Sequence, residues 1–175
     1  GSLGRLVPVK GHDALLRAFA PLAREFPQVD LALIGAGREE ETLRGLCADL
    51  GIANRVAFCG WHHDARRLLG ALDACVFASH DEGFGLAVAE AMAAGRPVIA
   101  PAVGAIPEVV GDCALLVPPE DEAALEAAMR RLVDDATLRE TMGAALRARW
   151  QDRFAPERFT AHLRDLALAA TETSP

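Results

Sequence analysis

Residues 81–95 read Asp81-Glu82-Gly83-Phe84-Gly85-Leu86-Ala87-Val88-Ala89-Glu90-Ala91-Met92-Ala93-Ala94-Gly95, a glycine-rich turn followed by good helix formers. Gly83 and Gly85 permit backbone conformations and close approaches that a Cβ atom would exclude. A helix that begins after such a turn presents unpaired N–H groups and the positive end of its dipole, and both favour an anion. The stretch therefore predicts a helix over 85–94 with an anionic ligand at its first turn.

Two acidic residues of this stretch, Glu82 and Glu90, are eight positions apart. With Glu90 in the second helical turn, a rise of about 1.5 Å per residue separates the two carboxylates by roughly 10 Å. One carboxylate can then hold each end of an extended ligand whose phosphates lie between them, which describes a nucleotide-sugar. The alternative is that both are ordinary exposed acids, Glu82 in a loop and Glu90 on a helix.

Outside this stretch, short apolar runs alternate with amphipathic segments. The runs are bounded by Gly, Pro or charged residues, and they predict buried strands at 29–34, 56–58, 74–78, 97–100 and 114–117. The amphipathic segments predict helices over 12–25, 39–50, 63–71 and 85–94. This alternation predicts right-handed βαβ units and an α/β fold with a doubly wound, Rossmann-like parallel sheet.

In such sheets, ligands bind beyond the carboxyl ends of the strands. Turns that follow predicted strands should therefore meet at one edge, and they lie at 4–11, 35–37, 60–64 and 80–85. The last sixty or so residues are mainly helical in pattern. After Pro118-Pro119, Asp121 is expected to cap a helix through about Arg131. Two further helices should follow and wrap the domain.

These motifs carry a resemblance to a known family. Glu82-Gly83-Phe84-Gly85-Leu86 with Glu90-Ala91, and Gly4-Arg5-Leu6-Val7-Pro8-Val9-Lys10-Gly11, resemble the two donor-site motifs of the retaining glycosyltransferases of family 4, which have the GT-B fold. Further segments occur in that family's order: Gly35-Ala36-Gly37, 55–60, 95–100 and 107–110. The resemblance covers almost the whole chain.

The resemblance implies the C-terminal, donor-binding domain of an enzyme that transfers a sugar from a nucleoside diphosphate to an acceptor. It implies no metal and no cofactor besides the donor substrate. It assigns Arg5 and Lys10 to the diphosphate oxygens, assisted by the backbone N–H groups of Gly85 and Leu86. Arginine can fork two phosphate oxygens, whereas lysine acts as a compact point charge.

By the same match, Glu82 holds hydroxyls of the donor sugar, so Glu82, Arg5 and Lys10 are the expected catalytic residues. Glu90 is assigned to the two ribose hydroxyls. The remaining expected donor contacts are Gly83 and Phe84 in the turn, and Trp61, His62 and Asp64 beside the base.

Other readings of these residues stay open. Arg5 and Lys10 can be surface charges, and His62 and His63 can be exposed loop histidines. His12 fits the start of its helix better than a catalytic role. Gly35-Ala36-Gly37 lacks the third glycine of a dinucleotide fingerprint, which argues against NAD or FAD.

The chain also departs from the family pattern in places. Gly104-Ala105 stands before Pro107-Glu108, where the family often has two adjacent glycines. The segment 111–116 is shorter than the family's usual loop, and the family varies at His80. These departures concern the donor-sugar contacts rather than the phosphate contacts.

We expect Gly1-Ser2 to be a remnant of cloning outside the fold, 3–170 to form the donor-binding domain, and 171–175 to be a frayed tail. The N-terminal acceptor-binding domain of the family has no counterpart in the sequence. The chain alone should therefore bind nucleotide without transferring sugar. The partners expected of the intact protein are a nucleotide-sugar and a glycan or lipid-linked acceptor.

Composition excludes several other classes of protein. Eighteen basic and 25 acidic residues give a net charge of −7, which argues against a nucleic-acid surface. Four cysteines without CxxC spacing fit free buried thiols in a reducing cytoplasm. No apolar run approaches the ~20 residues of a membrane span. We therefore expect a cytoplasmic protein, at the cytoplasmic face of a membrane where the acceptor is lipid-linked.

Two other functions are compatible with this architecture. A nucleotide-sugar 2-epimerase would need acid–base groups from the other half of the protein. A non-catalytic binding module would have little reason to keep Arg5, Lys10, Glu82 and Glu90 together.

Overall fold

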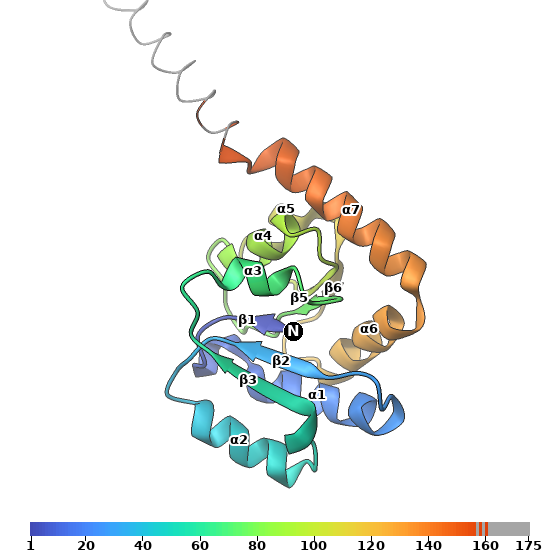
Figure 1. Cartoon of the computed structure of the whole chain (residues 1–175). Helices are drawn as coiled ribbons and strands as arrows, with labels where there is room; N and C mark the ends of the chain where they lie inside the picture. Colours follow the sequence, from blue (N-terminus) through green and yellow to red (C-terminus); the bar gives the residue numbers. More distant parts are fainter. Residues whose placement is uncertain (157, 159, 161–175) are drawn as a thin grey trace, which may run out of the picture.

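A computed structural model of the chain describes residues 1–156, 158 and 160 (Figure 1). Its six strands are β1 (Ser2–Leu3), β2 (Leu31–Ile34), β3 (Val56–Gly60), β4 (Cys75–Val76), β5 (Val98–Pro101) and β6 (Leu115–Val117). All paired strands are parallel, in the orders β1-β2-β3 and β4-β5-β6. The Val76 amide donates to the Gly1 carbonyl at 2.8 Å and so joins β4 to β1. The resulting order, β3-β2-β1-β4-β5-β6, confirms the predicted doubly wound fold.

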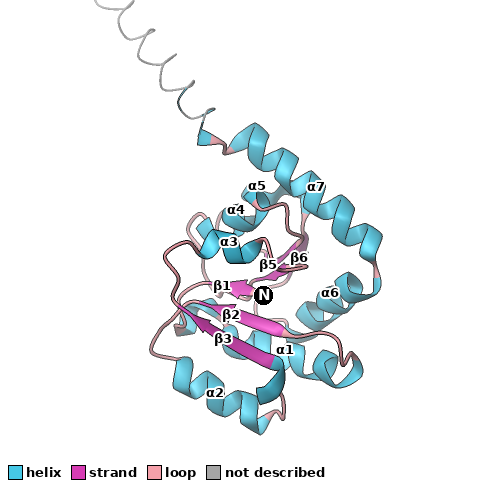
Figure 2. Ribbon diagram, in the orientation of Figure 1, coloured by secondary structure: helices cyan, strands magenta, loops and turns pink. Residues whose placement is uncertain are grey.

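Helices cover both faces of the sheet (Figure 2). One face carries α1 (His12–Glu25), α2 (Glu40–Asp49) and α6 (Glu122–Asp134). The other face carries α3 (Ala65–Leu69), α4 (Leu86–Ala93), α5 (Ile106–Val110) and α7 (Ala136–Arg153). Short 3-10 turns complete the chain at η1 (Pro8–Lys10), η2 (Ala53–Arg55) and η3 (Gly111–Cys113).

The C-terminal helices wrap the domain as predicted, because α6 packs on α1 and α7 packs on α4. Asp121 caps α6 by accepting a hydrogen bond from the Ala124 amide at 2.8 Å, although α6 continues to Asp134 rather than ending near Arg131. The second helix expected after α6 and the tail 171–175 lie outside the described residues. Within those residues, no helix is both long and apolar enough to cross a membrane.

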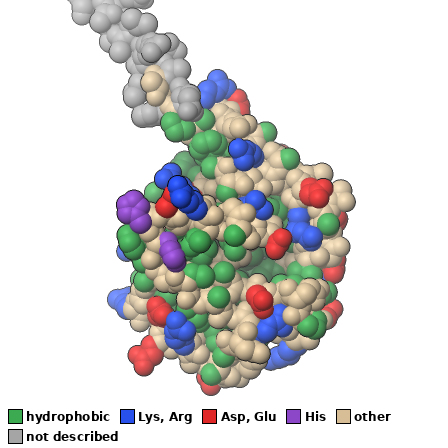
Figure 3. Space-filling view, in the orientation of Figure 1, with side chains coloured by type: hydrophobic (Ala, Val, Ile, Leu, Met, Phe, Trp, Pro, Cys, Tyr) green, Lys and Arg blue, Asp and Glu red, His purple; other side chains and the backbone are tan. Residues whose placement is uncertain are grey.

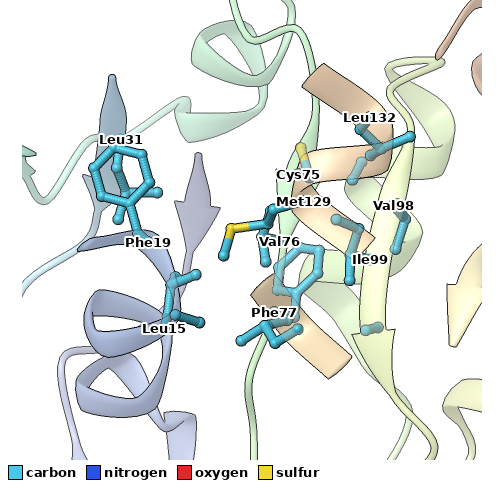
Figure 4. Close-up of a cluster of buried hydrophobic side chains, with 14 of the residues drawn as sticks. Leu15, Phe19, Leu31, Cys75, Val76, Phe77, Val98, Ile99, Met129 and Leu132 are labelled. Atoms are coloured by element: carbon cyan, nitrogen blue, oxygen red, sulfur yellow. The ribbon is translucent and has the colours of Figure 1, made fainter. Parts of the chain in front are cut away.

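Part of the hydrophobic core lies between α1, the sheet and α6 (Figure 4), and buried residues of α4, α5 and α7 continue it on the other face. Leu15 and Phe19 on α1 are almost fully buried, and Phe19 lies beside Leu31 of β2 (Figure 4). Each such side chain contributes roughly 1.5–3 kcal/mol through removal of apolar surface from water. This packing fixes α1, and with it the loop that precedes α1, relative to the sheet.

The expectation that Gly1-Ser2 lies outside the fold is wrong. Ser2 is buried and pairs with Leu33, and the Gly1 carbonyl accepts the hydrogen bond that joins β1 to β4. Strand β1 is short and ends at Leu3. Backbone pairing, which a sequence pattern does not display, decides the place of Gly1-Ser2 in the fold.

Smaller differences concern element ends and the cysteines. The predicted helix 63–71 is reduced to Ala65–Leu69, because Asp64 has a non-helical backbone. Of the predicted strand 74–78, only Cys75–Val76 is a strand in the structure. All four cysteines are free, but only Cys47 and Cys75 are buried, whereas Cys59 and Cys113 are half-buried.

Candidate functional site

The two predicted motifs meet at the carboxyl ends of β1 and β4, where the strand order reverses. Ligands of doubly wound sheets bind at this switch point. The loop after β1 spans 4–11 and the loop after β4 spans 77–85. They are joined directly, since the His80 amide donates to the Val9 carbonyl at 2.9 Å.

Lys10 and Glu82 form an ion pair across this junction, between Lys10 Nζ and Glu82 Oε1. Their side chains are only 22% and 12% exposed. Ser79 donates a second hydrogen bond, from Oγ to the same Oε1 atom, at 2.9 Å. Among the described residues, none hydrogen-bonds the other oxygen, Oε2. The carboxylate is thus held at one oxygen and available to a ligand hydroxyl at the other.

Glycines permit the close packing of the loops around this pair. A Cβ atom at Gly11 (φ 61°) would lie 2.1 Å from the Ala78 carbonyl oxygen. Gly85 (φ 79°) is the N-terminal cap residue of α4, and no side chain accepts a hydrogen bond from the first amides of that helix. The predicted glycine turn is therefore present, and α4 runs from Leu86 to Ala93 with no side-chain cap at its start.

Apolar side chains project around the start of α4. Leu86 is 72% exposed, and Phe84 is partly exposed with its ring edge-on to Phe154 at 5.6 Å between centroids. Glu90, one turn further along, faces a groove of about 1020 Å³ that Trp150 and Phe154 also line. Burial raises the pKa of Glu90, and Arg66 partly offsets this effect. The structure therefore places Glu82 just before the exposed N-terminus of α4, and Glu90 about one helical turn after it.

Arg5 lies on the same loop as Lys10 but does not join the ion pair. Its side chain is exposed and, within the described part of the chain, makes no hydrogen bond or ion pair. It lines a hollow of about 570 Å³ together with Val7, Pro8, Val9 and Arg38. Among the described residues Arg5 is thus an unpaired cation, in a hollow that neither Lys10 nor Glu82 lines.

The three residues expected near the base lie in the loop between β3 and α3. Trp61 is 72% exposed, and its ring contacts His63 edge-on at 6.3 Å between centroids. His62 Nε2 is hydrogen-bonded to the Cys59 carbonyl at 2.8 Å, and Asp64 pairs with Arg67 at 2.9 Å. Histidine side chains gather at the edge of the face shown in Figure 3, beside α3. None of the three expected residues makes a hydrogen bond or ion pair with Lys10 or Glu82.

The sequence analysis assigned no role in the site to three further residues. Ser79, which orients Glu82, has a signal in hindsight, because it is a polar residue directly after the apolar run 74–78. Gly104 supports the backbone of Glu82, as a Cβ atom there would lie 1.6 Å from the Glu82 carbonyl oxygen. His80 pairs through Nδ1 with Glu120 at 3.2 Å, a contact without a local sequence signal.

His12 begins α1, as expected, but it is also buried. Burial, together with the neighbouring Lys10 charge, lowers its pKa to about 4. Its Nδ1 atom is buried and has no hydrogen-bond partner in the described structure. The imidazole is therefore neutral at pH 7 and leaves Lys10 as the cation of this turn.

Known proteins resemble this chain in sequence and in fold. The profile of the family described as "Glycosyl transferases group 1" matches residues 1–135. The lipopolysaccharide core biosynthesis glycosyltransferase LpsD of Rhizobium meliloti (strain 1021) is 37% identical over 166 residues, covering 94% of this chain and 47% of LpsD.

Two solved structures have the same fold across nearly the whole chain. Anabaena Alr3699/HepE in complex with UDP aligns with a TM-score of 0.88 at 28% identity, covering 97% of this chain and 48% of HepE. Sucrose-phosphate synthase (tll1590) from Thermosynechococcus elongatus aligns with a TM-score of 0.86 at 33% identity, covering 99% and 46%. The chain spans about half the length of these relatives. By sequence and by the arrangement of its switch-point loops, the chain belongs to the glycosyl transferases of group 1.

Proposed function

We propose that this chain binds the nucleoside-diphosphate sugar of a retaining, metal-independent glycosyltransferase of family 4. The observation that carries the proposal is the Lys10–Glu82 pair, which is held by Ser79 at the switch point of the sheet. A carboxylate that is fixed at one oxygen beside cations and an uncapped helix start suits a ligand with both hydroxyls and phosphates.

The diphosphate is held by Arg5, Lys10 and the first amides of α4 at Gly85 and Leu86. As the bond from the sugar to the phosphate breaks, negative charge grows on the diphosphate and positive charge grows on the sugar. Fixed cations and amides then stabilise the leaving group through positioning and electrostatics. In this proposal these groups supply the positive charge, and neither a metal nor a cofactor is required.

Glu82 accepts hydrogen bonds from the donor sugar through its available oxygen, and Glu90 accepts them from the ribose. Both roles need an ionised carboxylate, which a glutamate supplies near pH 7. The exposed loop of Trp61, His62 and Asp64 contributes to the base site. Phe84 and Leu86 supply apolar contact to the part of the donor that lies between Glu82 and Glu90.

The solved complex of HepE with UDP supports a uridine nucleotide as the first donor to test. LpsD supports an acceptor that is a glycan or a lipid-linked glycan. We propose that the acceptor binds the other half of the protein, at the cytoplasmic face of a membrane. The chain alone then binds nucleotide but does not transfer sugar.

Calorimetric titration with UDP, GDP, ADP and their glucose or mannose conjugates tests the donor site. One nucleotide should bind selectively, and both Arg5→Ala and Glu90→Ala should weaken it about tenfold or more. Arg44→Ala is the matched control, because Arg44 is an exposed arginine that pairs with Glu40 on α2 at 2.8 Å. Equal effects of all three substitutions, or no binding by the folded chain, would overturn the proposed site.

A further inference from the structure

The turn after β4 that carries Glu82 is attached to the loop after β1. Ser79 Oγ donates to Glu82 Oε1 at 2.9 Å, so the residues on either side of the turn are joined by their side chains. His80, which lies between them, donates its amide to the Val9 carbonyl at 2.9 Å. The backbone of His80 therefore fixes one side of the turn, and its side chain is left to make a separate contact.

The His80 side chain connects the same turn to the other side of β4. Its Nδ1 atom lies 3.2 Å from Oε1 of Glu120, in the loop between β6 and α6. Strand β5 separates β6 from β4, so this contact joins the ends of two strands that are not neighbours in the sheet. Ala78, Pro101, Val117 and Glu120 line one small recess at this point, where the three strands end. The turn is thus held between the loops after β1 and β6.

Glu120 adopts a backbone conformation that its residue type disfavours. It has φ 61°, and among the described residues it alone, apart from glycines, has a positive φ. Glycine adopts this conformation without a steric penalty, whereas residues with a Cβ atom rarely do. The Glu120 side chain is 73% exposed, so burial of its own surface does not explain the conformation. A glycine would lack the contact with His80, and such strained residues concentrate at functional sites.

The strength of this contact depends on the charge of His80. The pair is ionic only when His80 is protonated, and histidine is the side chain whose charge ordinarily changes between pH 5 and 8. The other charged or titratable groups on the surrounding elements are Asp81 and Glu82 on the same loop, Lys10 and His12 after Val9, and Arg17, Asp121 and Glu122 toward α6.

Most of these surrounding groups are already engaged. Lys10 pairs with Glu82, Asp121 caps α6, and Glu122 lies 3.9 Å from Arg17. Glu120 is the acid that the structure places in contact with the imidazole of His80.

We propose that His80 and Glu120 position the Glu82 turn for the donor sugar, and that they do so when His80 is protonated. This inference rests on the proposed function, in which Glu82 accepts hydrogen bonds from that sugar. A protonated His80 draws the turn toward the β6–α6 loop and holds the available oxygen of Glu82 in place. A solvent-exposed pair of this kind changes an equilibrium by up to about fivefold. Other residues hold the nucleotide, so the effect falls on the sugar.

Calorimetric titration of the Glu120→Gln and unsubstituted chains with UDP-glucose and UDP, at pH 6 and pH 8, tests this inference. Glutamine keeps the shape of the side chain and removes its charge. At pH 6, Glu120→Gln should bind UDP-glucose about threefold to fivefold more weakly, whereas at pH 8 the two chains should bind it alike. Their UDP affinities should agree at both pH values. Glu122→Gln is the matched control, because Glu122 is an exposed acid at the start of α6, and it should match the unsubstituted chain throughout.

The Glu120→Gly substitution separates positioning from stability. It removes the contact with His80 but relieves the backbone, because glycine accepts a φ of 61°. This variant should therefore melt at or above the temperature of the unsubstituted chain, and it should show the same weakening for UDP-glucose at pH 6. Weakening that accompanies a lowered melting temperature would assign Glu120 a structural role instead.

Other outcomes overturn the inference without touching the nucleotide site. They are equal UDP-glucose binding by the Glu120→Gln and unsubstituted chains at pH 6, an equal loss at both pH values, the same loss in Glu122→Gln, and a chain that binds UDP but not UDP-glucose. Failure of the proposed function looks different, since UDP binding itself would then be absent or insensitive to Arg5→Ala and Glu90→Ala.

Discussion

A Cβ atom at Gly104 would lie 1.6 Å from the carbonyl oxygen of Glu82. Gly104 has φ 52°, and the next residue, Ala105, donates its amide to the Gly83 carbonyl at 3.2 Å. The loop between β5 and α5 therefore supports the backbone that presents the Glu82 carboxylate. Ala105 has φ −86°, an ordinary value for an alanine, so this chain needs one glycine where the family often has two.

Gly104→Ala should lower the free energy of unfolding by at least about 1–3 kcal/mol, because it adds a clash to a positive-φ conformation. It should also weaken UDP-sugar binding, since the Glu82 backbone must move. Urea unfolding and calorimetry measure the two effects. Gly45→Ala is the control, because Gly45 is an exposed helical position with open space around it and should gain up to about 1 kcal/mol. Equal stability of the Gly104→Ala and unsubstituted chains would contradict the account.

Ser79→Ala should separate sugar binding from nucleotide binding. The substitution removes the hydrogen bond to Glu82 Oε1 but leaves the Lys10 ion pair in place. We expect a loss of about 1 kcal/mol in stability, a several-fold loss of UDP-glucose affinity and unchanged UDP affinity. Thr141→Ala, which removes an exposed hydroxyl on α7, is the control. A parallel loss for UDP and UDP-glucose would show that Ser79 acts on the whole loop instead.

The sequence predicted the parts of the fold that rest on periodicity and turn chemistry. Helix α1 spans His12–Glu25 as predicted, and the helix after Gly85 begins within one residue of its expected start. Parallel strands were recognised because residues buried on both faces form continuous apolar runs. The sequence also predicted that the turns carrying Lys10 and Glu82 lie at the same edge of the sheet, although it did not predict their ion pair.

Contacts between segments distant in the sequence were not predictable in this way. The hydrogen bond from Ser79 can be read only once the Glu82 side chain is placed, and the Gly104 contact depends on a separate loop. Gly1-Ser2 was misjudged because its role lies entirely in backbone pairing with β2 and β4. Arg38 drew no attention, because only the packing of Gly37 on Leu6 brings it next to Arg5.

Glu90→Gln should stabilise the chain near pH 7 while weakening its binding of UDP. Burial raises the pKa of Glu90, so the folded state favours the protonated form and ionisation at neutral pH opposes folding. The unsubstituted chain should lose this part of its stability as the pH rises through the raised pKa, whereas a neutral glutamine should not. Thermal unfolding at pH 4 and pH 7 measures the difference. Glu140→Gln, on the exposed face of α7, should show neither effect, and a destabilised Glu90→Gln chain at pH 7 would refute the argument.

His12 should make the stability of the chain depend on pH in mildly acidic solution. Its pKa falls from the ordinary 6.5 to about 4 on folding, so the unfolded chain binds the extra proton between these values. Stability is therefore complete above about pH 6.5 and declines as the pH falls toward 4, by roughly 3 kcal/mol for a shift of this size. His12→Leu should remove this decline, because leucine binds no proton and leaves no buried nitrogen without a partner. The exposed His63→Gln substitution should preserve it, and an identical pH profile for His12→Leu and the unsubstituted chain would assign the decline to other groups.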